Sequence, residues 1–472
     1  MKDILLAVIN AKWIHPSPAL RLLKANLGPL ESRCEIIEFA LRQPLYEKTE
    51  PILAASPRIL GISVSIWNHL ATLELLKKLH EAWEAEAVKK PVIILGGPEV
   101  SYLPAESPEI FKFADYYIRG EGEIAFRELC GKILSEDDII VSHEFHTVNI
   151  TEIKSGYRMY TDEDVSKKLV YVEASRGCPF GCEFCLSAVG EPANKVREFP
   201  LEPFFSEMED LIRRGAKTFK FLDRTFNLNI ERARKIIEFF LHNINEQINQ
   251  NKKPFVVHFE MVPSRFPPEL IDTLARFPPN SLRLEIGIQT LNPGVSDRIS
   301  RPSKPEQELE TIGLLAKKTN AIIHADLIAG LPGEDMESFG KGFDALWAAF
   351  NGCDKKRVEI QPGILKLLPG AAIARHKEVF GLKFDASPPY ELIESAAIPE
   401  SGMNRIKNFA RFWELIVNRG LLDIGPSPVF DRFMALSDSL LARFGRNWGI
   451  AKDELINTIR ERGTGKREIK NA

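Results

Sequence analysis

The sequence predicts an α/β protein in which two series of parallel strands and helices follow one another and a helical region ends the chain. Residues 1–135 alternate short apolar runs with amphipathic stretches, and a second series of the same kind begins near Leu169. Beyond these two series the pattern is mostly helical. We therefore expect domains at 1–135, 166–370 and 371–472, with a charged, irregular linker at 136–165.

Length and composition support a multidomain globular protein. The chain has 472 residues, which is too many for one ordinary core. It is 44% hydrophobic and 27% charged, with a net charge of −3, so no electrostatic footprint predicts a nucleic-acid partner. The first residues lack a signal-peptide layout and no apolar run reaches membrane-spanning length, so we expect a cytoplasmic protein without a membrane partner.

The first series predicts a parallel sheet covered by helices. Its expected strands are Ile4–Ile9, Glu35–Phe39, Ile59–Ser63, Val92–Leu95 and Tyr116–Arg119. Its expected helices are Ala19–Leu27, Leu70–Glu86 and Ile124–Leu134. Ligands of such sheets bind at the carboxyl ends of the strands.

Small residues follow three of these strands. They are Ser63 and Ser65, then Gly96 and Gly97, then Gly120. Small side chains let the backbone approach a large flat ligand, but ordinary tight turns use the same residues. Each turn by itself is therefore compatible with both interpretations.

The second series predicts a partial (β/α)6 barrel. Its expected strands are Leu169–Ala174, Thr218–Leu222, Phe255–Met261, Ser281–Ile286, Ala321–Ile328 and Val358–Leu367. Its expected helices are Pro203–Arg214, Ile230–Gln247, Pro268–Phe277, Pro305–Lys318 and Glu337–Phe350. Barrel enzymes place their chemistry at the carboxyl-terminal mouth, where the loop after the first strand lies.

That loop carries Cys178, Cys182 and Cys185 in a C-x3-C-x2-C spacing. Three thiolates on one tight loop can converge on an iron–sulfur cluster and leave one iron open for a substrate. Structural zinc usually requires four ligands, and a disulfide would leave one thiol over. The remaining cysteines, Cys34, Cys130 and Cys353, stand singly and are expected in the core.

With Phe184 just before the third cysteine, this loop resembles the cluster loop of the radical S-adenosylmethionine (SAM) superfamily. The resemblance implies a [4Fe–4S] cluster whose open iron chelates the amino and carboxylate groups of SAM. It also implies a reductant such as flavodoxin or ferredoxin, because one electron cleaves SAM and releases a 5′-deoxyadenosyl radical.

The same resemblance assigns cofactor contacts at the ends of later strands. Asp223 matches a position that holds the SAM amine, Glu285 matches a ribose contact, and Gln289 matches a contact to SAM or substrate. The run from His324 through Asp326 to Gly330 is similar to the adenine-side motif. Structural alternatives remain: Asn227 or Asn229 can cap a helix, and Glu285 can form a buried salt bridge to Arg283 or Arg301. His258 and Glu260 share one strand face and can contact substrate, transfer protons or pair with each other.

The serine and glycine turns of the first series resemble, in order and spacing, the Rossmann-like (flavodoxin-like) cobalamin-binding domain of many radical SAM enzymes. Many such domains carry Asp-x-His-x-x-Gly after the first strand. Here His15 stands near the histidine position, but the aspartate and glycine are missing. His15 can therefore ligate cobalt, bind the nucleotide tail, or help to cap the helix at Ser17. The missing residues favour an arrangement without histidine ligation.

Together the resemblances imply a cobalamin-dependent radical SAM enzyme that methylates an unactivated carbon of a small-molecule or peptide substrate, through a 5′-deoxyadenosyl radical and methylcobalamin. Alternatives are a cyclase or rearrangement enzyme, a methylthiotransferase acting on RNA, and a non-catalytic iron–sulfur or cobalamin sensor. Methylthiotransferases carry extra N-terminal cysteines for a second cluster, and Cys34 and Cys130 are too few and too far apart for one. The helical end of the chain is expected to act as a cap.

Overall fold

The computed structural model describes residues 2–85, 89–104, 109–138, 144–189, 195–301 and 303–461. Parts of the predicted linker (139–143) and the last residues (462–472) lie outside this description. The chain forms two compact units, residues 1–177 with 195–222 and residues 178–194 with 223–472. Among the described residues, no helix has the length and apolarity that a membrane crossing requires.

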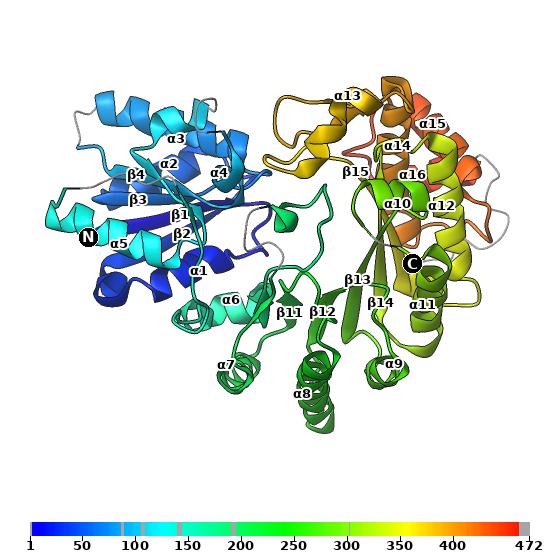
Figure 1. Ribbon diagram of the computed structural model, residues 1–472, viewed down its shortest axis with the longest axis horizontal. Coiled ribbons are helices and arrows are strands. Elements are labelled where there is room, and N and C mark those ends of the chain that lie inside the picture. Colours follow the sequence, from blue (N-terminus) through cyan, green and yellow to red (C-terminus); the bar gives the residue numbers. More distant parts are fainter. Residues whose placement is uncertain are drawn as a thin grey trace. The chain divides into compact units, whose positions relative to one another are not determined.

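The first unit contains a five-stranded parallel sheet (Figure 1). Its strands are β1 (Ile4–Asn10), β2 (Cys34–Ala40), β3 (Ile59–Ser63), β4 (Val92–Gly96) and β5 (Tyr116–Tyr117). The strand order is β2-β1-β3-β4-β5, and every pairing is parallel. This is the flavodoxin-like order, whose switch point lies between β1 and β3. The predicted parallel sheet is confirmed.

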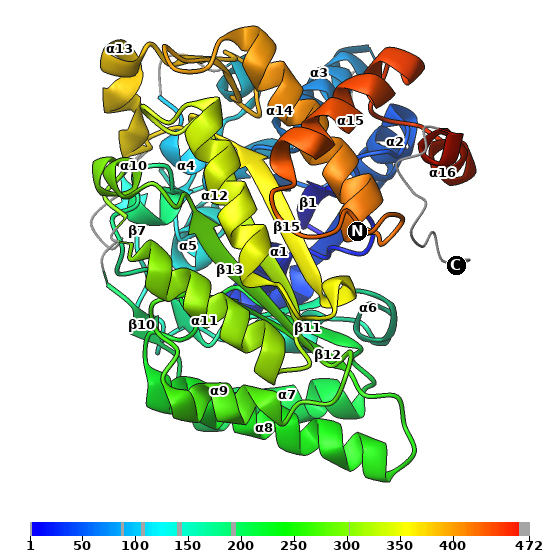
Figure 2. The ribbon, with the colours of Figure 1, turned by 90° about the vertical axis from the view of Figure 1, so that its right-hand side faces the viewer.

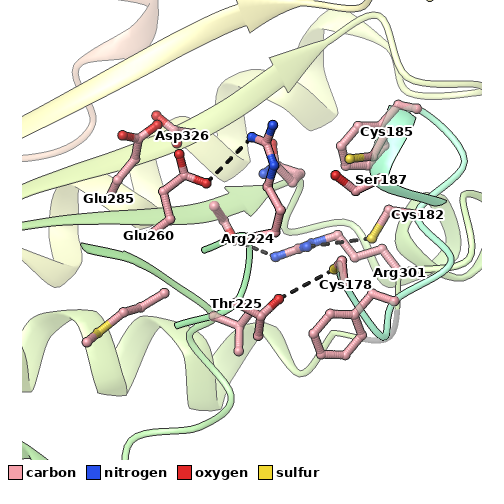
Figure 3. A pocket seen from close by; sticks show the side chains of 16 residues that line it. Cys178, Cys182, Cys185, Ser187, Arg224, Thr225, Glu260, Glu285, Arg301 and Asp326 are labelled. Carbon is pink, nitrogen blue, oxygen red and sulfur yellow. Dashed lines mark hydrogen bonds and ion pairs between the residues drawn. The ribbon is translucent and has the colours of Figure 1, made fainter. Parts of the chain in front are cut away.

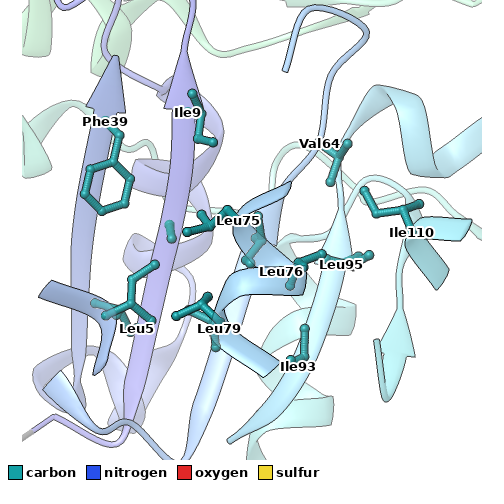
Figure 4. Packing of buried hydrophobic residues seen from close by; sticks show 14 of the residues in the cluster. Leu5, Ile9, Phe39, Val64, Leu75, Leu76, Leu79, Ile93, Leu95 and Ile110 are labelled. Atoms are coloured by element: carbon teal, nitrogen blue, oxygen red, sulfur yellow. The ribbon is translucent and has the colours of Figure 1, made fainter. Parts of the chain in front are cut away.

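Helices cover both faces of this sheet because the side chains of β1 alternate between two cores. Leu5, Ala7 and Ile9 join a cluster with α2 (Leu45–Ala55) and α3 (His69–Ala85), shown in Figure 4. The intervening residues of β1 join a second cluster with α1 (Pro18–Ala25) and α5 (Glu123–Ser135). All seven residues of β1 are buried, as a central strand requires. The sequence analysis missed α2, whose pattern is interrupted by Pro51.

The rest of the first unit contains short elements. They are α4 (Pro98–Tyr102), β6 (Arg119–Gly120), β7 (Phe145–His146), α6 (Asp162–Lys167), β8 (Val170–Val172), β9 (Ser175–Arg176), β10 (Arg197–Glu198), α7 (Leu201–Arg213) and β11 (Thr218–Phe221). Strands β8 and β11 pair in parallel, and they are the first two strands predicted for the second series. Strand β7 lies within the predicted linker and pairs with β6.

The second unit contains the other four predicted strands of the second series. They are β12 (Val256–Met261), β13 (Leu282–Gln289), β14 (Ile322–Ala329) and β15 (Val358–Ile364), paired in parallel in chain order. Their helices are α8 (Ile230–Asn249), α9 (Pro268–Ala275), α10 (Pro293–Arg298), α11 (Pro305–Lys318) and α12 (Met336–Ala349). Figure 2 shows α11 and α12 outside β13 and β15. All predicted strand–helix units are present.

The C-terminal part of this unit is mostly helical, as predicted. It contains α13 (Lys377–Phe380), α14 (Glu400–Trp413), α15 (Phe430–Phe444) and α16 (Lys452–Glu461). A hairpin of β16 (Lys383–Phe384) and β17 (Leu392–Glu394) was not predicted, because strands of two and three residues leave no periodic pattern. Aromatic side chains join this part to α12: the ring of Phe343 lies 4.7 Å from that of Trp413 and 5.1 Å from that of Phe409.

Two glycines of α12 test this packing. A Cβ added at Gly340 would lie 2.6 Å from the ring of Phe430 on α15, whereas one at Gly342 would meet nothing closer than 3.7 Å. We expect Gly340→Ala to lower the free energy of unfolding by about 1–3 kcal/mol through overpacking. Gly342→Ala should raise it by up to about 1 kcal/mol through helix propensity. Chemical unfolding of the two variants measures this, and equal effects would contradict the packing.

Candidate active site

The three cysteines of the C-x3-C-x2-C loop line one wall of a pocket of about 270 Å3 in the second unit (Figure 3). Cys178 and Cys182 are buried and Cys185 is half-buried. The loop turns tightly, with the amide of Cys185 donating to the carbonyl of Cys182 at 3.0 Å. Phe184 and Ser187 of the same loop also line the pocket.

Two polar groups contact the cysteine sulfurs. The Thr225 hydroxyl lies 3.4 Å from the Cys178 Sγ, and the Arg301 guanidinium lies 3.9 Å from the Cys182 Sγ. Burial raises the pKa of the Cys182 thiol, and the charge of Arg301 acts in the opposite direction. Cationic neighbours and hydrogen bonds to sulfur stabilise thiolates and tune iron–sulfur clusters. The donor set, three thiols on one wall beside a fixed positive charge, therefore fits a cluster held by three cysteines.

Carboxylates form the opposite wall. Glu260, Glu285 and Asp326 lie across the pocket from the cysteines, and Arg224 and Arg301 extend between the two walls (Figure 3). The register explains this arrangement, because Glu260 pairs with Glu285 across β12 and β13, and Asp326 pairs with Gly287 across β13 and β14. Inward residues of neighbouring barrel strands form layers in this way. The guanidinium of Arg224 lies 3.9 Å from the Glu260 carboxylate.

Two histidines belong to the same barrel strands. His258 Nε2 lies 3.1 Å from Glu285 Oε2, and the rings of His258 and His324 are stacked with centroids 5.6 Å apart. His324 Nδ1 contacts Glu359 Oε2 at 3.2 Å and the Gln361 side-chain amide at 2.6 Å. His258 thus lies in contact with a carboxylate that lines the pocket. The sequence analysis placed His258 and Glu260 on one face but did not pair His258 with Glu285.

The carboxyl edge of the first unit's sheet has the predicted small residues. Ser63 ends β3 and Gly96 ends β4, and the two residues pair in the register. Gly97 has φ +102°, and a Cβ there would lie 2.5 Å from the carbonyl oxygen of Val64. Gly120 has φ +78°, and a Cβ there would lie 2.3 Å from the carbonyl oxygen of His146. Backbone packing thus requires glycine at 97 and 120, whereas a Cβ at Gly96 would make only an ordinary contact, 3.8 Å from the carbonyl oxygen of Ile118.

Large apolar side chains are exposed beyond this edge. They are Trp13 and Ile14 in the loop after β1, Leu41 after β2, Trp67 in the loop after β3, and Leu70 at the start of α3. Trp13 and Trp67 are each more than half exposed, at 54% and 53%. Exposed aromatic side chains at the carboxyl edge of a parallel sheet are available to a ligand that binds there. Their position beside the switch point fits a large, flat, largely apolar ligand such as a corrin ring.

His15 lies in the loop after β1 and is half-buried. Its Nδ1 lies 2.6 Å from the Tyr171 hydroxyl, on β8 of the same unit. Burial and the charges of Lys12 and Lys220 lower the pKa of His15. The helix N-cap is Ser17, whose hydroxyl accepts from the amide of Leu20, so His15 does not cap α1. The structure thus gives His15 a protein partner within its own unit.

A network of ion pairs surrounds Arg176, two residues before the first cluster cysteine. Its guanidinium contacts Glu123 at 2.9 Å, Glu121 at 3.3 Å and Glu173 at 2.6 Å. Glu121 also pairs with Arg197. These arginines hold the pKa of the Glu121 carboxyl below its usual value despite burial. The network therefore connects the segment just before the cluster loop to the turn that carries Gly120.

Comparison with protein families assigns both halves of this architecture. A model of the B12 binding domain matches residues 4–130, and a model of the radical SAM superfamily matches residues 172–346. The chain belongs to the radical SAM superfamily and carries a B12-binding domain. The family resemblance and the predicted fold class are therefore confirmed. The predicted cofactors, a [4Fe–4S] cluster, SAM and cobalamin, are those of these two domains.

Curated relatives of this B12-binding radical SAM protein include named methyltransferases. It is 24% identical over 326 residues to an uncharacterised methyltransferase of Pyrococcus horikoshii, covering 62% of this chain and 66% of that protein. It is 21% identical over 397 residues to the cobalamin-dependent radical SAM methyltransferase TokK of Streptomyces tokunonensis, covering 76% and 54%. The chain thus spans between about half and two thirds of these relatives.

Solved structures of similar fold include two cobalamin-dependent enzymes. The radical enzyme OxsB matches with a TM-score of 0.65 at 15% identity, over 99% of this chain and 76% of that one. The methyltransferase TsrM of Kitasatospora setae, solved with cobalamin and a [4Fe–4S] cluster, matches with a TM-score of 0.61 at 17% identity, over 84% and 79%. At these identities the likeness concerns the fold.

The pocket of the radical SAM domain brings together most of the predicted barrel-mouth residues. Seven line it: Cys178, Cys182, Phe184, Cys185, Glu285, Gln289 and Asp326. Asp223 does not; it is buried, and the next two residues, Arg224 and Thr225, line the pocket instead. Asn229 caps α8, which confirms the helix-cap alternative for that residue. Asn227 instead bonds the backbone of Val262 through its side-chain amide. Arg301 was considered only as a salt-bridge partner, and no motif marks it as a neighbour of the cluster cysteines.

Gly330 also lies outside the pocket wall. It has φ +85°, and a Cβ there would lie 2.3 Å from the buried side chain of Leu392 on β17. The Gly-Leu-Pro-Gly turn therefore packs directly against the C-terminal hairpin. Close packing is sufficient reason for glycine at this position, and its predicted adenine contact stays a prediction.

Glu334 ends this turn as a buried carboxyl. Its Oε1 accepts from the Thr290 hydroxyl at 2.6 Å and from the Ser338 hydroxyl at 3.4 Å. Burial raises the pKa of Glu334 to about 7. The Glu334 carboxyl thus joins the loop after β13 to the start of α12.

We expect Glu334 to make stability pH-dependent. Its pKa is higher in the folded state than in the unfolded chain, so the contribution is full below about pH 4.5 and is lost as pH rises through about 7. This pKa shift corresponds to a change of at most about 3 kcal/mol in the free energy of unfolding. Glu334→Gln should remove this loss, so that its unfolding midpoint exceeds that of the wild type at pH 8 but not at pH 5. Glu337→Gln, at an exposed pair with Lys341 on the same helix, is the control. Parallel pH profiles for wild type and Glu334→Gln would contradict the assignment.

Proposed function

We propose that this protein is a cobalamin-dependent radical SAM methyltransferase that acts on an unactivated carbon of a small-molecule or peptide substrate. The observation that carries the proposal is one pocket with three cysteine thiols on one wall and three carboxylates on the other, in a chain that also has a B12-binding sheet. The curated relatives named as methyltransferases favour methylation over cyclisation or rearrangement. A shared fold alone does not distinguish these reactions.

Each wall of the pocket has a separate task. The three thiolates hold the cluster and leave one iron for the amino and carboxylate groups of SAM. The carboxylates of Glu285 and Asp326 are placed to accept hydrogen bonds from ribose hydroxyls and ammonium groups, while Arg301 neutralises charge at Cys182. When bound, the cluster and cobalamin supply the radical and methyl-transfer chemistry, and the protein supplies position and exclusion of water.

The electron for this chemistry must come from a reductant, for which we propose a flavodoxin or ferredoxin. An oxygen-sensitive cluster of this kind suits the reducing cytoplasm, where we place the reaction. We propose no nucleic-acid or membrane partner, because the net charge of −3 gives no basis for strong binding to an anionic surface.

Methylthiotransferases are also among the similar proteins, for example RimO of Nitratiruptor, 25% identical over 189 residues. That match covers 40% of this chain. The cysteines that a second cluster would need are unsuitable here: Cys34 and Cys130 are buried, and burial raises the pKa of Cys34 to about 12 and that of Cys130 still further above its usual value. Such thiols stay protonated in the core, so we prefer the cobalamin-dependent methyltransferase.

The first test concerns the cluster. Anaerobically reconstituted protein should hold one [4Fe–4S] cluster and cleave SAM to 5′-deoxyadenosine when reduced. Cys182→Ala should lower the rate of cleavage at least about 100-fold, because two thiolates cannot hold the cluster with one defined open iron. Cys353→Ala, at a half-buried single cysteine, is the matched control and should behave as wild type. Full cluster content and cleavage in Cys182→Ala would sink the assignment.

The second test concerns cobalamin and methyl transfer. The wild type should bind a corrinoid and form S-adenosylhomocysteine from SAM only when cobalamin is present. Failure to bind a corrinoid at saturating concentration would remove the methyltransferase proposal while leaving the cluster assignment intact.

The third test concerns His15. Because His15 already contacts Tyr171 and the usual flanking aspartate and glycine are missing, His15→Ala should bind corrinoid with an unchanged cobalt spectrum. Tyr171→Phe, which removes only the contacting hydroxyl, is the matched control. Electron paramagnetic resonance of the cob(II)alamin form decides the point: nitrogen hyperfine splitting from a lower ligand, lost in His15→Ala, would show that His15 ligates cobalt.

A further inference from the structure

Glu183, between the second cluster cysteine and Phe184, is the most firmly held residue of the cluster loop. Its side chain is buried, with 4% exposure. One carboxylate oxygen accepts from the Ser300 hydroxyl at 2.7 Å and from Arg375, and the other contacts His376 Nε2 at 2.9 Å. A buried carboxylate is costly unless it is paired in this way.

The backbone of Glu183 is fixed as well. Its amide donates to the carbonyl of Ile299 at 3.1 Å, and its carbonyl accepts from the amide of Ile373 at 2.9 Å. Both polar groups of the main chain and both carboxylate oxygens are therefore bonded to residues outside the loop. By contrast, a Cβ at Gly181, two residues earlier, would meet nothing within 4 Å.

Two distant segments supply these contacts. Ile299 and Ser300 directly follow α10, while Ile373, Arg375 and His376 belong to the short helical turn Ala372–His376, which lies beyond the last barrel strand. The C-terminal region thus contacts the cluster loop at the residue next to Cys182. The sequence analysis expected a cap there and did not connect it with the cluster.

The same C-terminal segment also contacts the predicted adenine side. The guanidinium of Arg298 on α10 lies 4.7 Å from the ring centroid of Phe380 and donates to the carbonyl of Pro332 in the Gly-Leu-Pro-Gly turn. The ring centroids of Phe380 and His376 are in turn 5.7 Å apart. One chain of contacts therefore runs from Glu183 through His376, Phe380 and Arg298 to Pro332.

We propose that Glu183 is a positioning residue through which the C-terminal segment 372–380 fixes the cluster loop. In this role Glu183 sets the place of the Cys182 sulfur, and with it the geometry and protection of the cluster. The C-terminal region is then part of the cluster site rather than only a cover over the substrate. The proposal rests on the cluster and does not depend on which substrate is methylated.

The test measures how firmly the cluster is held, without substrate. Reconstituted protein is challenged with an iron chelator under anaerobic conditions, and the rate of iron release is followed by absorbance. Glu183→Ala should release iron at least about tenfold faster than wild type. Glu183→Gln keeps the shape and the acceptor for Ser300 and should restore most of the protection, to within about threefold of wild type.

Substitutions of the residues that contact Glu183 test the same contact from the other side. His376→Ala should accelerate release about threefold to fivefold, and Arg375→Ala less, because its side chain is 63% exposed and its charge is screened. In the double variant of Glu183 and His376 the effects should not add, since both act through one contact. Arg405→Ala, which breaks an exposed pair with Asp438 in the same C-terminal region, is the matched control and should leave the rate unchanged.

A spectroscopic measurement separates positioning from general stability. The electron paramagnetic resonance spectrum of the reduced cluster should change in Glu183→Ala and return toward wild type in Glu183→Gln. Wild-type release rates and spectra in both Glu183→Ala and His376→Ala would overturn the proposal. If Glu183→Ala fails to fold, His376→Ala alone decides in the same way. Absence of methyl transfer in the wild type would contradict only the proposed function.

Discussion

The radical SAM unit depends on holding three thiols in one place on a loop that has almost no regular structure. A helix or strand would position cysteines through its own hydrogen bonds, but this loop must obtain its shape from its surroundings. The surroundings supply it through buried polar contacts: Thr225 at Cys178, Arg301 at Cys182, and Ser300 and His376 at Glu183. Polar contacts are strong in such a site because water is excluded, and each one also costs stability if its partner is lost.

The carboxylate wall has a different origin, since regular strands position it. The parallel register of β12, β13 and β14 places Glu260 beside Glu285, and Glu285 beside His324. Carboxylates held so close repel one another. A neighbouring cation offsets this repulsion and lowers the free energy needed to keep them ionised. Arg224 serves that purpose for Glu260, at 3.9 Å, and the His258 ring contacts Glu285 at 3.1 Å. The pocket thus combines an acidic wall on regular strands with a loop in which Thr225 and Arg301 contact two of the three cysteine sulfurs.

The sequence was most informative where periodic burial dictates the structure. Strands such as Ile59–Ser63 and helices such as Pro305–Lys318 were predicted to the residue, because the strand is a continuous buried run and the helix starts at a proline and carries apolar residues at helical spacing. The helix Leu45–Ala55 was missed because Pro51 interrupts its pattern. In the site, the cysteine spacing and the strand-end acids were recognisable as local motifs. Arg301 and the pairing of His258 with Glu285 were not, because they depend on which residues the fold brings together across the sequence.

The C-terminal region shows the same limit most clearly. Its helices are visible in the sequence, and their aromatic side chains explain how they pack on α12, with Phe343 against Trp413. A helical pattern cannot reveal that the chain first crosses to the cluster loop and places His376 against Glu183. The same path brings Leu392 onto Gly330, where only glycine leaves room for it. Two motifs far apart in the sequence, the cysteine loop and the Gly-Leu-Pro-Gly turn, are therefore both contacted by one segment, residues 372–392. Neither contact follows from the sequence pattern of this segment, because each depends on the path of the chain between the last barrel strand and the C-terminal helices.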